Sequence, residues 1–182
     1  DQNRGGPPQP PGVQIADIGG GALFAVSGML AALYERQRSG KGRMVDVSMC
    51  EGSLAFAVAG LGASFGGQPL AQGTHPLMGG IAPYNTYATK DGKAVSLGAL
   101  EPKFWMAFCR GTGLEASMEA LLPGPHQSHW KGLVAAKLAE RTRDEWVAFA
   151  DEHDCCLEPV LLPDEVAQDP QHVFRKMFVP GP

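Results

Sequence analysis

The sequence predicts an α/β fold in two parts, and three observations carry this prediction. An apolar helix over residues 20–38 is followed by a glycine turn and an alternating strand, a unit typical of layered α/β domains. A long stretch rich in glycine and proline, residues 66–83, then separates this part from the remainder. Beyond it, two short alternating strands and several amphipathic helices indicate a small α+β domain.

The composition fits a folded chain with its own core. Of 182 residues, 44% are hydrophobic and 19% are charged, which is not the profile of a disordered chain. The net charge of −4 gives no reason to expect nucleic acid or an anionic membrane surface as a partner. We expect no membrane span, because Arg36 and Arg38 end the longest apolar run. The proline-rich start, residues 1–11, predicts an extended connector and not a signal peptide.

The cysteines indicate a reducing compartment. Cys50, Cys109, Cys155 and Cys156 follow no zinc or disulfide spacing, and adjacent cysteines cannot easily bridge to each other. We therefore expect free thiols and a cytoplasmic protein.

The segment that organises the first part is a carboxylate placed just before a glycine-rich helix start. Asp17 precedes the three glycines at 19–21, and the apolar helix follows. At an N-cap, the Asp17 side chain would accept from unpaired helix N–H groups, which also favour developing negative charge. Glycines let a ligand approach the backbone closely. The plain alternative is a capping aspartate at a flexible helix start.

The rest of the first part predicts helix, strand and helix. The helix from residue 20 is apolar on most sides, which indicates burial. The turn at residues 39–42 ends it, and residues 43–49 alternate as a strand with Val45 and Val47 on one face. Residues 50–65 are small and apolar, and they predict a second buried helix.

The second part begins with a predicted hairpin. Strands over 84–89 and 93–98 flank a turn in which Asp91 and Gly92 supply the positive φ angles. A short strand over 157–161 contains Pro159, which favours an edge position.

Helices are predicted around these strands. Glu101 would cap a helix with Pro102 at its first position, and a second helix follows over 128–140. Thr142 and Glu145 form the capping box of a third. Residues 163–167 predict a helical turn that ends at 169–170. The three tryptophans lie in apolar stretches at helical spacing and are expected in the core: Trp105, Trp130 and Trp146.

An ordered set of motifs resembles the family III CoA-transferases (CaiB/BaiF type), which include alpha-methylacyl-CoA racemase. The motifs are ADIGGG at 16–21, ERQRSGKGRMVDVSM at 35–49, GGIAPYNTY at 79–87, KDGK at 90–93 and VSLGALEPKFW at 95–105. Within the last, GALEPKF is most similar to the racemase branch. The resemblance runs from about residue 10 to the end of the chain.

The resemblance implies a domain organisation. The family has a Rossmann-like large domain and a small α+β domain in an interlocked homodimer. By this resemblance, residues 1–65 are the C-terminal part of the large domain, 66–83 a linker loop, 84–168 the small domain, and 169–182 the start of the return linker. The first part of the large domain would carry most of the CoA surface and a catalytic histidine. None of the five histidines stands in that motif, so we expect a fragment that is inactive alone.

The resemblance also implies site residues. Asp17 matches the family's catalytic aspartate, Glu101 the carboxylate that orients the missing histidine, and Tyr84 a tyrosine near the aspartate. Four glycines are expected to border the acyl-CoA: Gly19, Gly20, Gly79 and Gly80. The plain alternatives are a helix cap for Glu101, packing for Tyr84, and a simple turn for the second glycine pair.

Two chemistries follow from the resemblance. In the racemases a proton moves at the carbon alpha to a thioester, and this predicts epimerisation of a 2-methylacyl-CoA. The first alternative is CoA transfer between acids, in which the aspartate attacks the thioester. The second alternative is a non-catalytic piece that serves in dimerisation or binding. We expect no permanently bound cofactor and no metal, since coenzyme A arrives as part of the substrate.

Overall fold

The chain divides into two compact units, Asp1–Gln72 and Gly73–Pro182. The computed structural model describes residues 10–68, 71–179 and 181. The division between the units falls within the glycine-rich and proline-rich stretch at residues 66–83.

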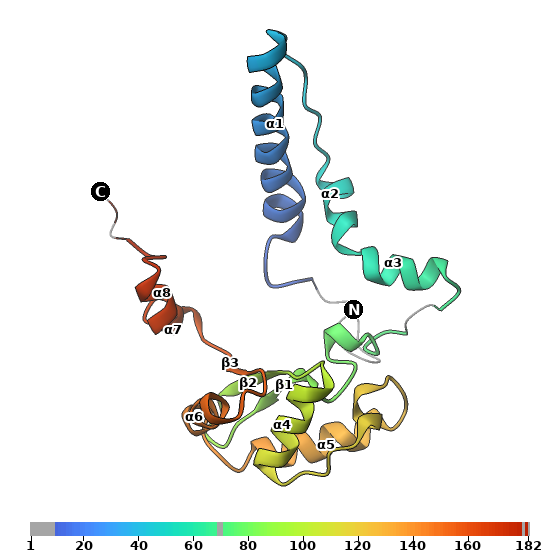
Figure 1. The fold of residues 1–182 in the computed structure, drawn as a ribbon, viewed down its shortest axis with the longest axis vertical. Helices are drawn as coiled ribbons and strands as arrows, with labels where there is room; N and C mark the ends of the chain where they lie inside the picture. Colours follow the sequence, from blue (N-terminus) through green and yellow to red (C-terminus); the bar gives the residue numbers. More distant parts are fainter. Residues whose placement is uncertain (1–9, 69–70, 180, 182) are drawn as a thin grey trace. The chain divides into compact units, whose positions relative to one another are not determined.

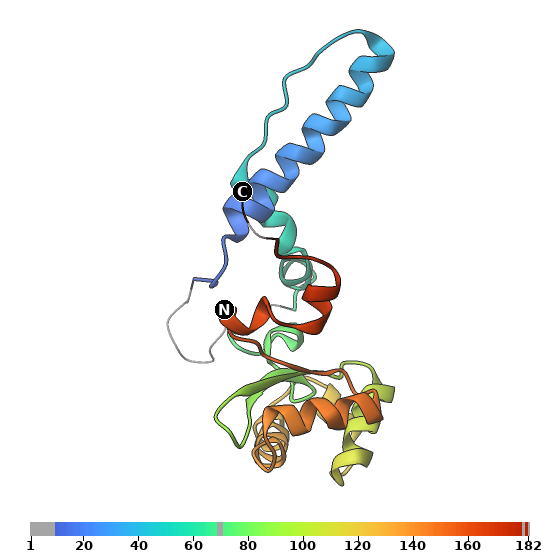
Figure 2. The same cartoon turned by 90° about the vertical axis from the view of Figure 1, so that its left-hand side faces the viewer.

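The first unit is built from helices and one extended segment. A π-helical turn, η1 (Ile15–Leu23), runs directly into α1 (Phe24–Ser39). Gly40 ends α1 with a φ of 68°, and its N–H donates to the Arg36 carbonyl at 2.8 Å, as the glycine turn predicts. The chain then runs back along α1 in extended form to α2 (Met49–Phe56) and α3 (Val58–Phe65) (Figure 1 and Figure 2).

The strand predicted over residues 43–49 does not form. Residues 41–48 are extended but unpaired, and Ser48 instead caps α2 by accepting from the Glu51 N–H at 3.3 Å. A strand needs a neighbour for its backbone groups, and the described part of this unit contains no other strand. The helix predicted over 50–65 is also divided, at Ala57, where ψ is 6°.

Helix α1 is apolar but uncovered, so the predicted burial is wrong for this chain. Among the described residues, none of α1 is buried, and Phe24, Leu30 and Leu33 are 45%, 62% and 53% exposed. The continuous helix Ile15–Ser39 has 25 residues and a mean hydropathy of 1.6 over its most apolar 18. By length and composition alone it could cross a membrane, contrary to the expectation that no run is long enough. Core helices of soluble proteins meet the same test.

The second unit has a small antiparallel sheet in the order β1-β2-β3. β1 (Tyr84–Ala88) pairs with β2 (Ala94–Gly98) through the predicted hairpin. Gly92 has a φ of 75°, as predicted, but Asp91 does not have the predicted positive φ. β3 (Leu157–Pro159) pairs with β2 at the edge that its proline predicts. A 3-10 turn, η2 (Pro76–Met78), precedes the sheet.

Helices lie beneath this sheet in the views of Figure 1 and Figure 2. They are α4 (Pro102–Thr112), α5 (Gln127–Leu138) and α6 (Arg143–His153), with η3 (Met118–Leu121) between α4 and α5 in the chain. Helices α7 (Pro163–Val166) and α8 (Pro170–Phe174) follow β3 and do not belong to this layer (Figure 1 and Figure 2). All three tryptophans are buried in the core, as predicted. The predicted helical turn is α7, but residues 169–170 begin a further helix after it. Asp169 caps this helix, α8, by accepting from the Gln171 and His172 N–H groups.

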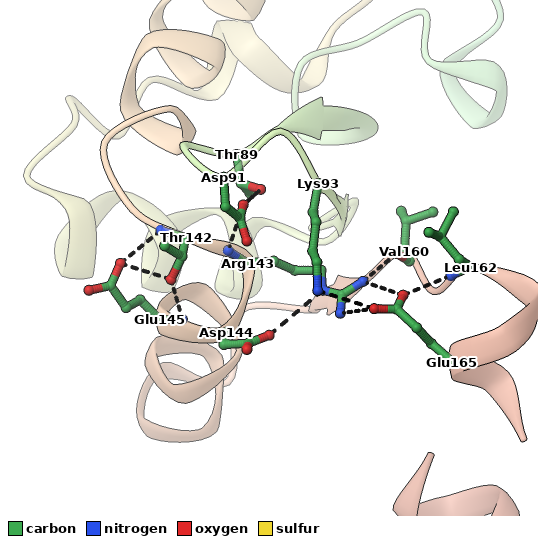
Figure 3. A network of polar contacts seen from close by, with 10 residues as sticks. All are labelled: Thr89, Asp91, Lys93, Thr142, Arg143, Asp144, Glu145, Val160, Leu162 and Glu165. Atoms are coloured by element: carbon green, nitrogen blue, oxygen red, sulfur yellow. Dashed lines mark hydrogen bonds and ion pairs between the residues drawn. The ribbon is translucent and has the colours of Figure 1, made fainter. Parts of the chain in front are cut away.

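A partly buried ion pair ties the C-terminal segment to the rest of this unit (Figure 3). The Arg143 guanidinium donates two hydrogen bonds of 2.7 Å to the Glu165 carboxylate of α7, and a third of 3.1 Å to the Val160 carbonyl. Lys93, which immediately precedes β2, also contacts Glu165 at 3.1 Å. The neighbouring capping box of Thr142 and Glu145 is confirmed. This geometry anchors residues 160–165 to α6.

Candidate active site

Asp17 lies inside the first turn of a helix and does not cap it. The helix begins at Ile15 with Gln14 at the N-cap position, and no side chain accepts a capping hydrogen bond there. The prediction that Asp17 is the cap is therefore wrong, because the π-helical turn starts earlier than the glycines suggest. Asp17 is exposed. A carboxylate in the first turn still interacts favourably with the helix dipole.

The glycines after Asp17 are used in close helix packing. A Cβ on Gly20 would lie 2.7 Å from the Ser53 nitrogen and 2.8 Å from the Met49 carbonyl oxygen, both in α2. Gly20 is buried, and Gly52 of α2 faces it with equally little room. Gly19 is half-buried, and a Cβ added to it would lie 3.1 Å from the Phe56 ring. The contact with α2 explains why this helix start needs glycine, and the substrate role of Gly19 and Gly20 stays a prediction.

A cavity of about 410 Å³ lies beside this packing site, between α1, the extended segment and α2. Apolar and small residues line it together with the Asp46 and Glu51 side chains; among them are Gly20, Phe24, Gly28, Val45 and Gly52. Asp17 is not part of its lining. The cavity and Asp17 are thus separate features of the same unit.

The remaining predicted site residues belong to the second unit. Gly79 ends η2 with a φ of 77°, and Gly80 donates to the His75 carbonyl at 2.9 Å. Both glycines therefore form a tight turn, and their predicted place beside the acyl-CoA stays a prediction. Tyr84 begins β1 opposite Gly98 and is half-buried.

Glu101 stands at the N-cap of α4, next to Pro102 at the first helical position, as predicted. Its backbone carbonyl accepts from the Phe104 and Trp105 N–H groups, but its exposed side chain makes no capping hydrogen bond. The side chain is therefore not used in holding the helix.

A thiol that no sequence motif marks lies in the electrostatic neighbourhood of Glu101. Burial raises the pKa of Cys156, and the charges of Asp154 and Glu101 raise this pKa further. The Cys156 carbonyl accepts from the Gly98 N–H at 2.7 Å, so the residue lies at the end of β2. Spacing in the sequence could not reveal it, because the contact joins strands that are distant along the chain.

The structure groups the predicted residues by unit. Asp17, Gly19 and Gly20 lie in the first, and Gly79, Gly80, Tyr84 and Glu101 in the second. Across residues 10–68, 71–179 and 181, no cluster of three or more histidine, cysteine, aspartate or glutamate side chains could hold a metal ion. The described cysteines are free thiols, with Cys109 and Cys155 buried. Burial raises their pKa values to about 12 and about 11.

Comparison with known proteins shows the class to which this fold belongs. The model of CoA-transferase family III matches residues 2–182. Alpha-methylacyl-CoA racemase of Mus musculus is 36% identical over 180 residues, which cover 94% of this chain and 46% of that protein. Succinyl-CoA–D-citramalate CoA-transferase of Chloroflexus aurantiacus is 28% identical, covering 96% of this chain and 46% of that protein.

A solved structure supports the same fold. The crystal structure of Rv3272 from M. tuberculosis matches 93% of this chain and 45% of its own, with a TM-score of 0.70 and 19% identity. The chain thus spans about half the length of the relatives it matches. Because the family model covers nearly all of it, the chain belongs to CoA-transferase family III, whose members include both racemases and CoA-transferases.

Proposed function

We propose that the whole protein containing this chain acts on an acyl-CoA thioester and transfers a proton at the carbon alpha to the thioester carbonyl, so that a 2-methylacyl-CoA is epimerised. The observation that carries the proposal is Asp17, an exposed carboxylate in the first turn of a glycine-rich helix, in a chain similar to alpha-methylacyl-CoA racemase. Coenzyme A would enter as part of the substrate.

Proton transfer needs two acid/base groups, one on each face of the carbon. On one face the Asp17 carboxylate would remove the proton and leave an enolate, and a group on the other face would return a proton. Backbone N–H groups at a helix N-terminus stabilise the negative charge that forms on the thioester oxygen. Glu101 would orient the second group, a histidine by family resemblance, which the motifs of this chain do not contain.

The alternative reaction is CoA transfer between carboxylic acids. The Asp17 carboxylate would attack the thioester carbonyl and displace CoA thiolate, which gives a mixed anhydride. The thiolate would then attack the aspartyl carbonyl, release the donor acid and form an aspartyl-CoA thioester. The acceptor carboxylate would attack this thioester in turn, and the thiolate would finally attack the acceptor's carbonyl, which forms the new acyl-CoA and frees the aspartate. The similarity to succinyl-CoA–D-citramalate CoA-transferase favours this alternative. Both reactions assign the chemistry to the same carboxylate.

A further alternative is that this chain by itself only binds or dimerises. It rests on the chain's coverage of about half of each relative. The whole protein would form an interlocked homodimer in the cytoplasm, as we expect from the family resemblance and the free cysteines.

Isotope exchange separates the two reactions. The whole protein is incubated with a 2-methylacyl-CoA in deuterium oxide without an acceptor acid, and deuterium at the alpha carbon is measured by mass spectrometry. Incorporation with inversion supports epimerisation. Exchange of label between a free acid and the thioester, without alpha deuteration, supports CoA transfer. The presence of both signals would be compatible with the proposed acyl-CoA chemistry. The absence of both signals would contradict it.

A further inference from the structure

The loop at residues 79–83, which joins η2 to β1, is largely buried although it belongs to no helix or strand. Gly80, Ile81, Ala82 and Pro83 are buried, and Ile81 and Ala82 are 0% exposed. Buried loops need partners for their backbone groups, because water cannot supply them. Several of the partners here come from side chains.

Gln127 provides the hydrogen-bond acceptor for a backbone N–H group near the C-terminal end of this loop. Its Oε1 accepts from the Ala82 N–H at 2.7 Å, and its Nε2 donates to the Ala120 and Leu122 carbonyls at 2.8 and 2.7 Å. The side chain is 4% exposed. A primary amide offers two donors and a carbonyl acceptor, and all of these functions are used. Gln127 therefore joins the loop to the segment that contains η3.

Lys131 holds the other end of the same loop. It follows Gln127 by four residues on α5, so the two side chains share one face of the helix. Its Nζ donates to the Gly79 carbonyl. Tyr87 adds a third contact, because its hydroxyl donates to the Ala82 carbonyl at 2.8 Å, and burial raises the pKa of Tyr87 so that it stays a donor.

The glycines of the loop leave it little freedom to adjust. Gly79 has a φ of 77°, which disfavours any other residue. A Cβ on Gly80 would lie 2.5 Å from the His75 carbonyl oxygen, and one on Gly79 would lie 2.7 Å from Asn85 Oδ1. The backbone of residues 79–83 is thus held in one conformation by packing and by α5.

We propose that Gln127 and Lys131 are positioning residues that preorganise the loop at residues 79–83 for the acyl-CoA. The proposal rests on the proposed function and on the family resemblance, by which Gly79 and Gly80 are expected to border the substrate. Neither side chain needs to touch the substrate. A loop already held in its bound form avoids an ordering cost when ligand arrives, which lowers Kd and KM.

The test uses Gln127→Met and Lys131→Met in the whole protein, with the 2-methylacyl-CoA as substrate. The loop would contact the substrate in the ground state and the transition state alike, so KM should rise about tenfold while kcat changes by less than about threefold. Hydrogen exchange of the peptide spanning residues 79–84 should become faster in both variants, because the loop loses an anchor.

Thr142→Ala is the matched control. It removes the cap of α6, in the same unit and without a contact to the loop, so it lowers stability without the proposed effect. Its KM and its exchange at residues 79–84 should equal those of the wild type. If Gln127→Met does not fold, the test rests on Lys131→Met, which is expected to fold because the Lys131 side chain is only half-buried.

The outcomes separate the two proposals. A wild-type protein without any acyl-CoA turnover contradicts the proposed function and, with it, this inference. If the wild type turns over the acyl-CoA but Gln127→Met and Lys131→Met keep a normal KM, only the positioning role is overturned. The same holds if KM rises equally in Thr142→Ala.

Discussion

Substitution of Asp17 should have little effect on the stability of the helix that carries it. It accepts no capping hydrogen bond, and the cap position belongs to Gln14. Its structural contribution is the interaction of a first-turn carboxylate with the helix dipole, about 0.3–1 kcal/mol. A large loss of turnover on substitution would therefore report chemistry and not unfolding.

Glu101 permits a similar separation. Its side chain does not cap α4, so Glu101→Gln should leave the tryptophan-detected melting midpoint unchanged. Turnover of the whole protein should fall, because an amide orients a histidine less well than a carboxylate, but by less than on substituting Asp17. A lower midpoint with full turnover would instead make Glu101 a structural cap.

At the scale of elements, the contact of η1 with α2 depends on paired glycines. Gly52→Ala would place a methyl group against the Gly20 backbone, and overpacking of this kind costs about 1–3 kcal/mol. We expect a lower denaturation midpoint by far-UV circular dichroism. Gly60→Ala in α3 is the control, because no atom lies within 4 Å of a Cβ added there. Equal midpoints for the two variants would contradict a tight helix contact.

The Arg143–Glu165 ion pair should make the second unit acid-sensitive. The Arg143 guanidinium, the Leu162 N–H and Lys93 hold the pKa of Glu165 well below its usual range. Because the folded pKa is depressed, the carboxylate stabilises the fold above its unfolded pKa of about 4.3. That stability is lost as the pH falls through the folded value. Glu165→Gln should therefore be less stable than the wild type at pH 7, with the difference shrinking below about pH 4.

Tryptophan fluorescence measures this effect selectively, since all three tryptophans lie in the second unit. Glu140→Gln is the matched control, because Glu140 forms an exposed pair with Lys137 on the same unit. Exposed pairs contribute little, so this variant should follow the wild type. A Glu165→Gln difference that stays constant between about pH 3 and pH 7 would rule out the ion pair as its source.

At the scale of the whole molecule, the first unit exposes a large apolar surface. Leu23, Phe24, Met29, Leu30 and Leu33 of the long helix are each at least 45% exposed. Many exposed apolar side chains on one helix favour association. We expect this chain, expressed by itself, to self-associate in sedimentation velocity, and the whole protein to bury the same surface. A cooperatively unfolding monomer would contradict this expectation.

Local patterns in the sequence predict local structure well, but they do not predict contacts between residues that are distant along the chain. The capping box at Thr142 and the turn at Gly92 follow from neighbouring residues, and both are confirmed. The strand over 43–49 rests on alternation alone, which cannot supply a pairing partner. Gln127 and Lys131 have a visible i,i+4 spacing, but their partners in the loop at 79–83 are distant along the chain. Their role is therefore visible only in the folded structure.

The most direct test of the central claim is Asp17→Asn in the whole protein, assayed for alpha-carbon deuterium incorporation and for label exchange. Asparagine keeps the size of the side chain but neither takes up the proton nor attacks a thioester. We predict that both activities disappear while the melting midpoint stays within the change expected for about 1 kcal/mol. Near-normal turnover in this variant would contradict the assignment of Asp17 as the reacting carboxylate.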